Sequence, residues 1–80
     1  MEIHERLLAL REDNDISREE LSIQIHCSTK QIERWEKNRS EMGITKLKTL
    51  CEYYGVSADY VLGLPEGLSW PRRNQREQLT

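Results

Sequence analysis

The apolar residues of this chain recur three or four positions apart, which is the spacing of one face of an α-helix. Ile3, Leu7 and Leu10 share a face of the first predicted helix, and Leu47 and Leu50 share a face of a later one. This spacing and the stop signals between segments predict five helices, over about residues 2–14, 18–24, 29–37, 44–54 and 58–62. The expected fold class is therefore all-α, a compact five-helix domain with a short C-terminal tail.

One hydrophobic core is expected to hold these helices together, because a chain of 80 residues with 36% hydrophobic content allows a single domain. Its expected members are ten residues: Ile3, Leu7, Leu10, Leu21, Ile25, Ile32, Trp35, Leu47, Leu50 and Leu62. Cys27 and Cys51 are expected to pack with them as small apolar side chains. We predict a domain over residues 1–64 and a polar tail over residues 65–80, in which Trp70 either marks an interface or folds back.

Two capping signatures stand close together in the sequence. Ser17 and Glu20 fit the S-x-x-E capping box, and Ser28 and Gln31 fit its S-x-x-Q form. Because the two caps are eleven residues apart, they leave room for one short helix and a tight turn at Ile25-His26-Cys27. This arrangement is the helix-turn-helix unit.

Helical geometry divides the third predicted helix into a buried and an exposed face. At about 100° per residue, Ile32 and Trp35 point inward. The opposite direction holds donors and one carboxylate, on Thr29, Lys30, Glu33, Arg34 and Lys37. Such groups can donate to guanine, contact thymine or accept from cytosine in the major groove of DNA. A charged helix face is more often merely solvated, but the turn before this one favours the DNA-binding interpretation.

Charge is distributed unevenly along the chain. The net charge of −2 excludes a strongly basic nucleic-acid coat. Residues 1–27 nevertheless carry −4 and residues 28–48 carry +3. The positive middle segment is a weak indication of an anionic partner.

Enzymes, metal sites and membrane spans are disfavoured by the sequence. His4 and His26 have no acid or nucleophile at a recognisable spacing, and His26 with Cys27 and Cys51 lacks a fourth zinc ligand. We therefore expect no enzyme, no metal and no cofactor. No apolar run approaches the ~20 residues of a membrane helix. Since the N-terminus also lacks a signal pattern, a cytoplasmic protein without a membrane partner is expected.

These features, in this order, resemble the Cro-type, lambda-repressor-like helix-turn-helix proteins, also called the xenobiotic-response-element family. The resemblance covers residues 3 to about 64. It is carried by Ile3, Arg6-Leu7, Leu10-Arg11, Ser17-Arg18-Glu19-Glu20-Leu21, Ser28, Ile32-Glu33-Arg34-Trp35-Glu36-Lys37, Leu47, Leu50, Tyr54-Gly55-Val56-Ser57 and Asp59-Tyr60-Val61-Leu62-Gly63-Leu64. It implies five helices, of which the second and third bind DNA and the third lies in the major groove.

The resemblance also implies roles for individual residues. The implied base contacts are Thr29, Lys30 and Arg34, and the implied phosphate contacts are Arg18, Lys37, Asn38 and Arg39. The implied structural ion pair, between the first and third helices, is Arg11 with Glu36. The chain departs from the family pattern at Arg18, where Gln is common, and at His26 and Asn38, where Gly is common.

The expected function is sequence-specific binding of double-stranded DNA by a transcriptional regulator. Because 16 residues follow position 64, we expect no sensor domain and repression by occupancy of the operator. A homodimer is expected, through the fourth and fifth helices or the tail, on half-sites about 34 Å apart. The alternative is the antitoxin of a toxin–antitoxin pair, which binds its own promoter and docks its tail on a protein partner.

Overall fold

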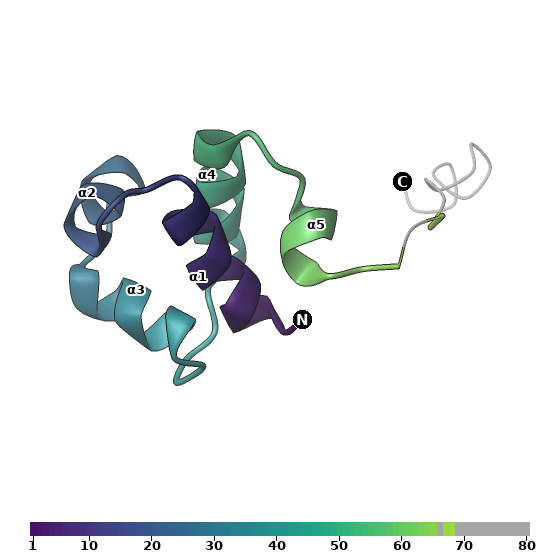
Figure 1. The fold of residues 1–80 in the computed structure, drawn as a ribbon, viewed down its shortest axis with the longest axis horizontal. Coiled ribbons are helices and arrows are strands. Elements are labelled where there is room, and N and C mark those ends of the chain that lie inside the picture. The colour runs from purple at the N-terminus through teal and green to yellow at the C-terminus, as the bar shows by residue number, and fades with distance from the viewer. Residues whose placement is uncertain (66, 69–80) are drawn as a thin grey trace, which may run out of the picture.

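The computed structural model describes residues 1–65, 67 and 68, and these form five α-helices without a strand. The helices are α1 (Ile3–Asp13), α2 (Arg18–Gln24), α3 (Thr29–Glu36), α4 (Ile44–Tyr54) and α5 (Ala58–Leu62). The all-α, five-helix prediction is confirmed, and each helix ends within about a residue of its expected bound. In Figure 1, α2 and α3 occupy one end of the domain, and α1 and α4 lie between them and α5. Most of the predicted tail, including Trp70, lies outside the described residues.

Serine side chains cap three of the helices. The Ser28 hydroxyl accepts from the Gln31 backbone N–H at 3.1 Å, and the Gln31 side chain accepts from the Ser28 N–H at 3.0 Å. Ser17 likewise accepts from the backbone of Glu20 at 3.1 Å, and Ser57 caps α5 in the same way. The capping box also predicts that the Glu20 carboxylate accepts a hydrogen bond from the Ser17 backbone N–H. The structure describes both residues and does not show this bond, so the capping box at α2 is only half formed. Glu20 is exposed, so its carboxylate does not need the backbone as a partner.

Three residues other than glycine take the left-handed backbone conformation at helix ends. Asp15, His26 and Asn38 have φ angles of 55°, 57° and 58°. His26 and Asn38 are the two positions at which the resembling family commonly has glycine, the residue that adopts this conformation most readily. A left-handed residue with a side chain costs roughly 1–2 kcal/mol. All three residues are exposed, and in each case a backbone hydrogen bond spans the residue, from Ile16 to Arg11, from Cys27 to Ser22 and from Arg39 to Arg34.

All five helices contribute side chains to one hydrophobic core. Its buried hydrophobic members are Leu7, Leu10, Leu21, Ile25, Ile32, Trp35, Leu50 and Val61. Leu47, Cys27 and Cys51 are half-buried and pack against this cluster. Burial raises the pKa of both cysteine thiols above the ordinary value, as expected of side chains that pack rather than react.

Two of the ten predicted core residues were wrong, and one core residue was missed. Ile3 is 45% exposed and Leu62 is 38% exposed, whereas Val61 is completely buried. In a helix as short as α5, one residue of rotation decides which side chain faces inward, and Val61 is the one that packs. Ile3 stands in the first turn of α1 and borders an open pocket.

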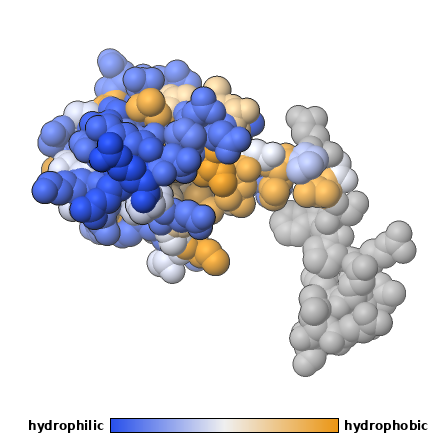
Figure 2. Space-filling view, turned by 90° about the horizontal axis from the view of Figure 1, so that it is seen from below, coloured by the Kyte–Doolittle hydropathy of each residue, from blue (hydrophilic) through white to orange (hydrophobic). Residues whose placement is uncertain are grey.

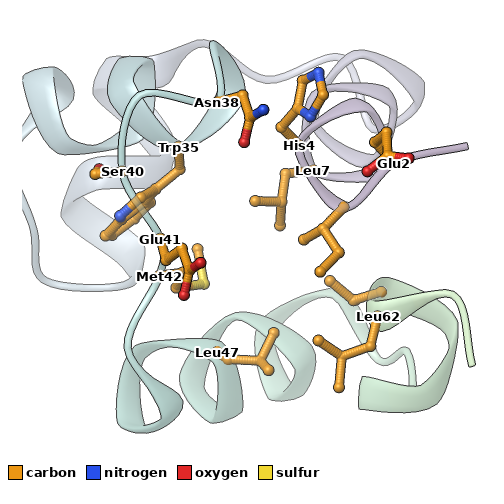
Figure 3. A pocket seen from close by; sticks show the side chains of 12 residues that line it. Glu2, His4, Leu7, Trp35, Asn38, Ser40, Glu41, Met42, Leu47 and Leu62 are labelled. Carbon is orange, nitrogen blue, oxygen red and sulfur yellow. The ribbon is translucent and has the colours of Figure 1, made fainter.

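Ile3 and Leu62 instead line an open pocket of about 330 Å³ between α1, α5 and the loop after α3 (Figure 3). Trp35 and Met42 line the opposite wall and Leu47 the floor. Because Ile3 and Leu62 border this pocket, they remain exposed although their spacing along the helices is that of core residues. No helix of the described residues has the length and apolar character that crossing a membrane requires.

Candidate nucleic-acid interface

A lysine of α4 forms hydrogen bonds to the backbone of the turn between α2 and α3. The Lys46 ammonium group donates to the backbone carbonyls of Ile25 at 2.7 Å and His26 at 2.8 Å. The Cys27 N–H donates to the Ser22 carbonyl at 3.0 Å and completes the turn. Lys46 therefore satisfies the carbonyl end of α2 and fixes the angle between the two helices. No local sequence pattern reveals this role of Lys46, because twenty and twenty-one positions separate it from its two partners.

We expect Lys46→Met to lower the free energy of unfolding by about 1.5–3 kcal/mol, the usual range for hydrogen bonds to a charged group. The methionine retains the apolar stem but leaves two carbonyls without their donor. Urea unfolding followed by circular dichroism measures the effect. Lys48→Met, an exposed position of the same helix, is the matched control and should change stability by less than about 0.5 kcal/mol. Equal stability of the two variants would contradict the assigned role.

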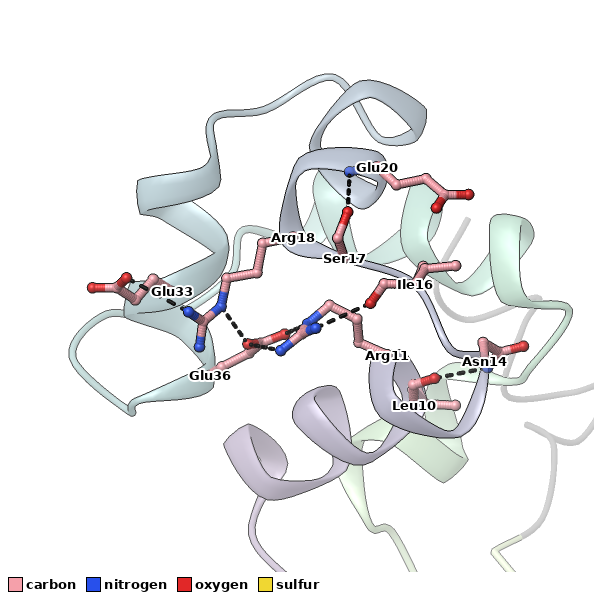
Figure 4. A network of polar contacts seen from close by, with 9 residues as sticks. All are labelled: Leu10, Arg11, Asn14, Ile16, Ser17, Arg18, Glu20, Glu33 and Glu36. Atoms are coloured by element: carbon pink, nitrogen blue, oxygen red, sulfur yellow. Dashed lines mark hydrogen bonds and ion pairs between the residues drawn. The ribbon is translucent and has the colours of Figure 1, made fainter.

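A buried carboxylate on α3 joins α3 to α1. Glu36 is only 5% exposed. Its two oxygens accept from Arg11, from Nε at 2.7 Å and from Nη2 at 3.1 Å, while Arg11 Nη1 donates to the Ile16 carbonyl at 3.0 Å (Figure 4). The hydrogen bond and the charge of Glu36 raise the pKa of Arg11 above its ordinary value. The structure thus brings together the two residues implied to form a structural ion pair.

Arg18 extends this contact to the exposed side of α3. Its Nε donates to Glu36 Oε1 at 3.0 Å, and its Nη1 lies 3.6 Å from Glu33 Oε2. Glu33 Oε1 lies 3.4 Å from the ammonium group of Lys37. We call these five residues the ion-pair ladder: Arg11, Glu36, Arg18, Glu33 and Lys37. The hydrogen bonds of Arg11 and Arg18 to Glu36 join α3 to α1 and α2 and fix the orientation of α3. The pair of Glu33 with Lys37 lies within α3 and its C-cap.

The outer face of α3 carries the residues implied to contact bases. Lys30 and Arg34 are exposed and form no ion pair with another described residue, and Thr29 is half-buried at the first position of the helix. Figure 2, which views the domain from below Figure 1, shows an almost continuous hydrophilic surface on the end that carries α2 and α3. Thr29, Lys30 and Arg34 do not line the pocket, and α3 and α5 lie at different ends of the domain (Figure 1).

The residues implied to contact phosphate have different environments. Lys37, Asn38 and Arg39 are exposed at the end of α3, where the Arg39 N–H donates to the Arg34 carbonyl at 2.8 Å. Arg18 is engaged in the ion-pair ladder, and 31% of its side chain remains exposed. The sequence placed Arg18 near the DNA side but did not reveal its two carboxylate partners. Fifteen and eighteen positions separate it from them, and no local pattern links them.

Tyr54 is the last residue of α4, near enough to Glu36 and Arg11 of the ion-pair ladder for their charges to affect its pKa. Its hydroxyl is buried and has no hydrogen-bond partner among the described residues. Burial, with smaller contributions from Tyr53 and Glu36, raises the pKa of Tyr54 to about 12. The folded protein therefore holds the phenol neutral over a wider range of pH than the unfolded chain does.

Tyr54→Phe is expected to flatten the alkaline dependence of stability. The folded pKa lies above the unfolded value of 10.0, so the stabilising contribution is complete below pH 10 and is lost as the pH rises toward 12. At pH 7 the variant should be as stable as the wild type or up to about 1 kcal/mol more stable, because it removes an unpaired buried hydroxyl. Urea unfolding at pH 7, 10 and 11 tests this, with Tyr53→Phe as the exposed control. A loss of stability above pH 10 that is as steep in Tyr54→Phe as in the wild type would contradict it.

Known transcriptional regulators resemble this chain in sequence or in fold. The chain is 27% identical over 79 residues to the HTH-type transcriptional activator BcrR of Enterococcus faecalis, and it spans only 39% of the length of that protein. A crystal structure of a transcriptional regulator from Listeria innocua has the same fold, with a TM-score of 0.76 and 18% identity over 98% of this chain and 72% of that one. Residues 4–67 match the helix-turn-helix domain family. With a match over most of its length, the chain belongs to the helix-turn-helix domain family.

Proposed function

We propose that this chain is the sequence-specific DNA-binding unit of a transcriptional regulator and that α3 enters the major groove. The observation that carries the proposal is the contrast between the two sides of α3. Its inner side is fixed by Glu36, which is 5% exposed and bound to α1 and α2. Its outer side presents Lys30 and Arg34 to the solvent. A rigid helix with free donors on its exposed face is what base readout requires.

In this proposal, one set of residues contacts the bases and another contacts the phosphates. Thr29, Lys30 and Arg34 contact base edges and choose the sequence. Phosphate contacts from Arg18, Lys37, Asn38 and Arg39 set affinity and register. The chain as a whole is slightly acidic, with a net charge of −2. We therefore expect modest affinity that decreases steeply with salt concentration.

A homodimer on a two-fold operator is the expected binding form, because one small unit makes few base contacts. Apolar side chains remain exposed on the fourth and fifth helices, among them Ile44 (86%), Tyr60 (47%) and Leu62 (38%). These positions supply apolar area for such a contact on α4 and α5, separate from the cations of α3.

Repression by occupancy is the proposed result of binding, since it requires only that the bound domain excludes polymerase from the promoter. The BcrR relative is named an activator, and the chain spans 39% of it. A reporter gene placed behind the bound site measures the direction. Lower expression supports repression, and higher expression would show that the chain acts as its named relative does.

Selection of bound duplexes from a random DNA pool tests the proposed function. We expect enrichment of one short motif, present as an inverted repeat with half-sites about one helical turn apart. The selection should be run at about 0.05 M and 0.2 M salt, because phosphate contacts weaken strongly over this range. Failure to enrich any motif at the lower salt concentration would reject the proposal.

A further inference from the structure

The two carboxylates of α3 are in different environments. Glu36 is buried and holds α3 against α1 and α2, while the side chain of Glu33 is 44% exposed. At about 100° per residue, Glu33 lies between Thr29 and Lys37 around the helix, on the exposed face assigned above to the DNA bases. A negative charge on that face opposes contact with the phosphate backbone, so its presence needs an explanation.

Both oxygens of Glu33 face cations that have been assigned to DNA phosphates. Oε2 lies 3.6 Å from Arg18 Nη1, and Oε1 lies 3.4 Å from Lys37 Nζ. All three side chains are partly exposed, at 31% for Arg18, 44% for Glu33 and 48% for Lys37. Exposed ion pairs of this kind contribute little to folding stability. Their main consequence is for a ligand that approaches the same surface.

Duplex DNA of arbitrary sequence must compete with Glu33 for these two cations. Phosphates that bind both Lys37 Nζ and Arg18 Nη1 leave the Glu33 carboxylate without its partners and close to other negative charges. Each phosphate contact that is lost reduces affinity by a factor that depends on salt concentration. Glu33 therefore weakens binding to DNA in general.

A base with a hydrogen-bond donor would compensate the carboxylate. In the major groove, cytosine presents its N4 amino group, and a carboxylate accepts from it. A cognate site with cytosine opposite Glu33 then supplies a new donor when Arg18 and Lys37 turn to the phosphates. A site without cytosine there supplies none.

We propose that Glu33 is a specificity-determining residue, which opposes binding to DNA in general and is satisfied in the cognate site by the amino group of a cytosine. The proposal rests on the proposed function, since it requires α3 to lie in the major groove. It differs from that function in assigning the selectivity to a carboxylate, in addition to the donors Thr29, Lys30 and Arg34.

Glu33→Gln tests the proposal, with affinity measured on the selected site and on a random-sequence duplex from about 0.05 to 0.3 M salt. We expect the random duplex to bind the variant roughly three- to tenfold more tightly near 0.1 M salt, with a salt slope steeper by about one. The ratio of specific to non-specific affinity should fall at least about tenfold, and selection with the variant should lose a cytosine from the motif.

Glu52→Gln is the matched control, because it removes the same charge from an exposed position of α4. An equal gain in random-duplex affinity for the two variants would overturn the proposal, since total charge alone would then explain it. An unchanged affinity ratio in Glu33→Gln would overturn it as well. If the wild-type chain binds no duplex at all, the proposed function itself fails. If the wild-type chain binds its site normally and Glu33→Gln does not alter this binding, only the proposal for Glu33 fails.

Discussion

Replacing Arg11 by methionine is expected to lower the free energy of unfolding by about 3 kcal/mol, the largest loss of stability that we predict for a single substitution in this domain. Arg11 makes two hydrogen bonds to Glu36, whose side chain is 3% exposed, and one to the Ile16 carbonyl. Without Arg11, the buried carboxylate retains only the single bond from Arg18 at 3.0 Å. A buried charge that loses its main partner costs far more than the ion pair itself contributes.

Thermal unfolding provides the measurement. For a domain of this size, the expected loss corresponds to a fall in the melting temperature of roughly 10–25 °C. The double variant Arg11→Met with Glu36→Leu removes both charges and should recover a large part of the loss, because the uncompensated carboxylate is gone. Lys48→Met, at an exposed position, controls for the removal of one positive charge. A melting temperature for Arg11→Met within a few degrees of the wild type would show that the pair does not hold α1 to α3.

The sequence predicted those features of the fold that depend on neighbouring residues. Ser28 and Gln31 cap α3 as expected, and Ile32 and Trp35 are buried, because caps and helix faces are set within three or four positions. The error at Val61 and Leu62 arose where this local rule is weakest. A helix of five residues has too few positions for its periodicity to define the inward direction.

Contacts between distant segments could not be predicted in the same way. Lys46 binds carbonyls twenty and twenty-one positions away, and Arg18 binds Glu33 and Glu36 from another helix. These partners depend on how the helices pack, which no local pattern encodes. As a result, the sequence indicated which side of α3 faces outward, but the structure was needed to identify what holds Glu33 and Arg18 there.

Lys30→Ala combined with Arg34→Ala is expected to remove most of the discrimination between the selected site and other DNA. A good side-chain contact to a base edge contributes about 1–3 kcal/mol of discrimination. Loss of two such contacts should lower the ratio of specific to non-specific affinity by at least about thirtyfold. The fold should persist, because both side chains are exposed, and thermal unfolding should show a change of less than about 0.5 kcal/mol per substitution.

Lys37→Ala combined with Arg39→Ala separates base reading from simple loss of charge. This variant also removes two exposed cations, but from positions assigned to phosphates. It should weaken binding to all duplexes by a similar factor and reduce the salt slope by about one or two, while largely preserving the affinity ratio. The contrast between the two double variants is the critical result. If both lower the affinity ratio equally, or if neither does, then Lys30 and Arg34 act only through their charge, and the sequence must be read by other residues.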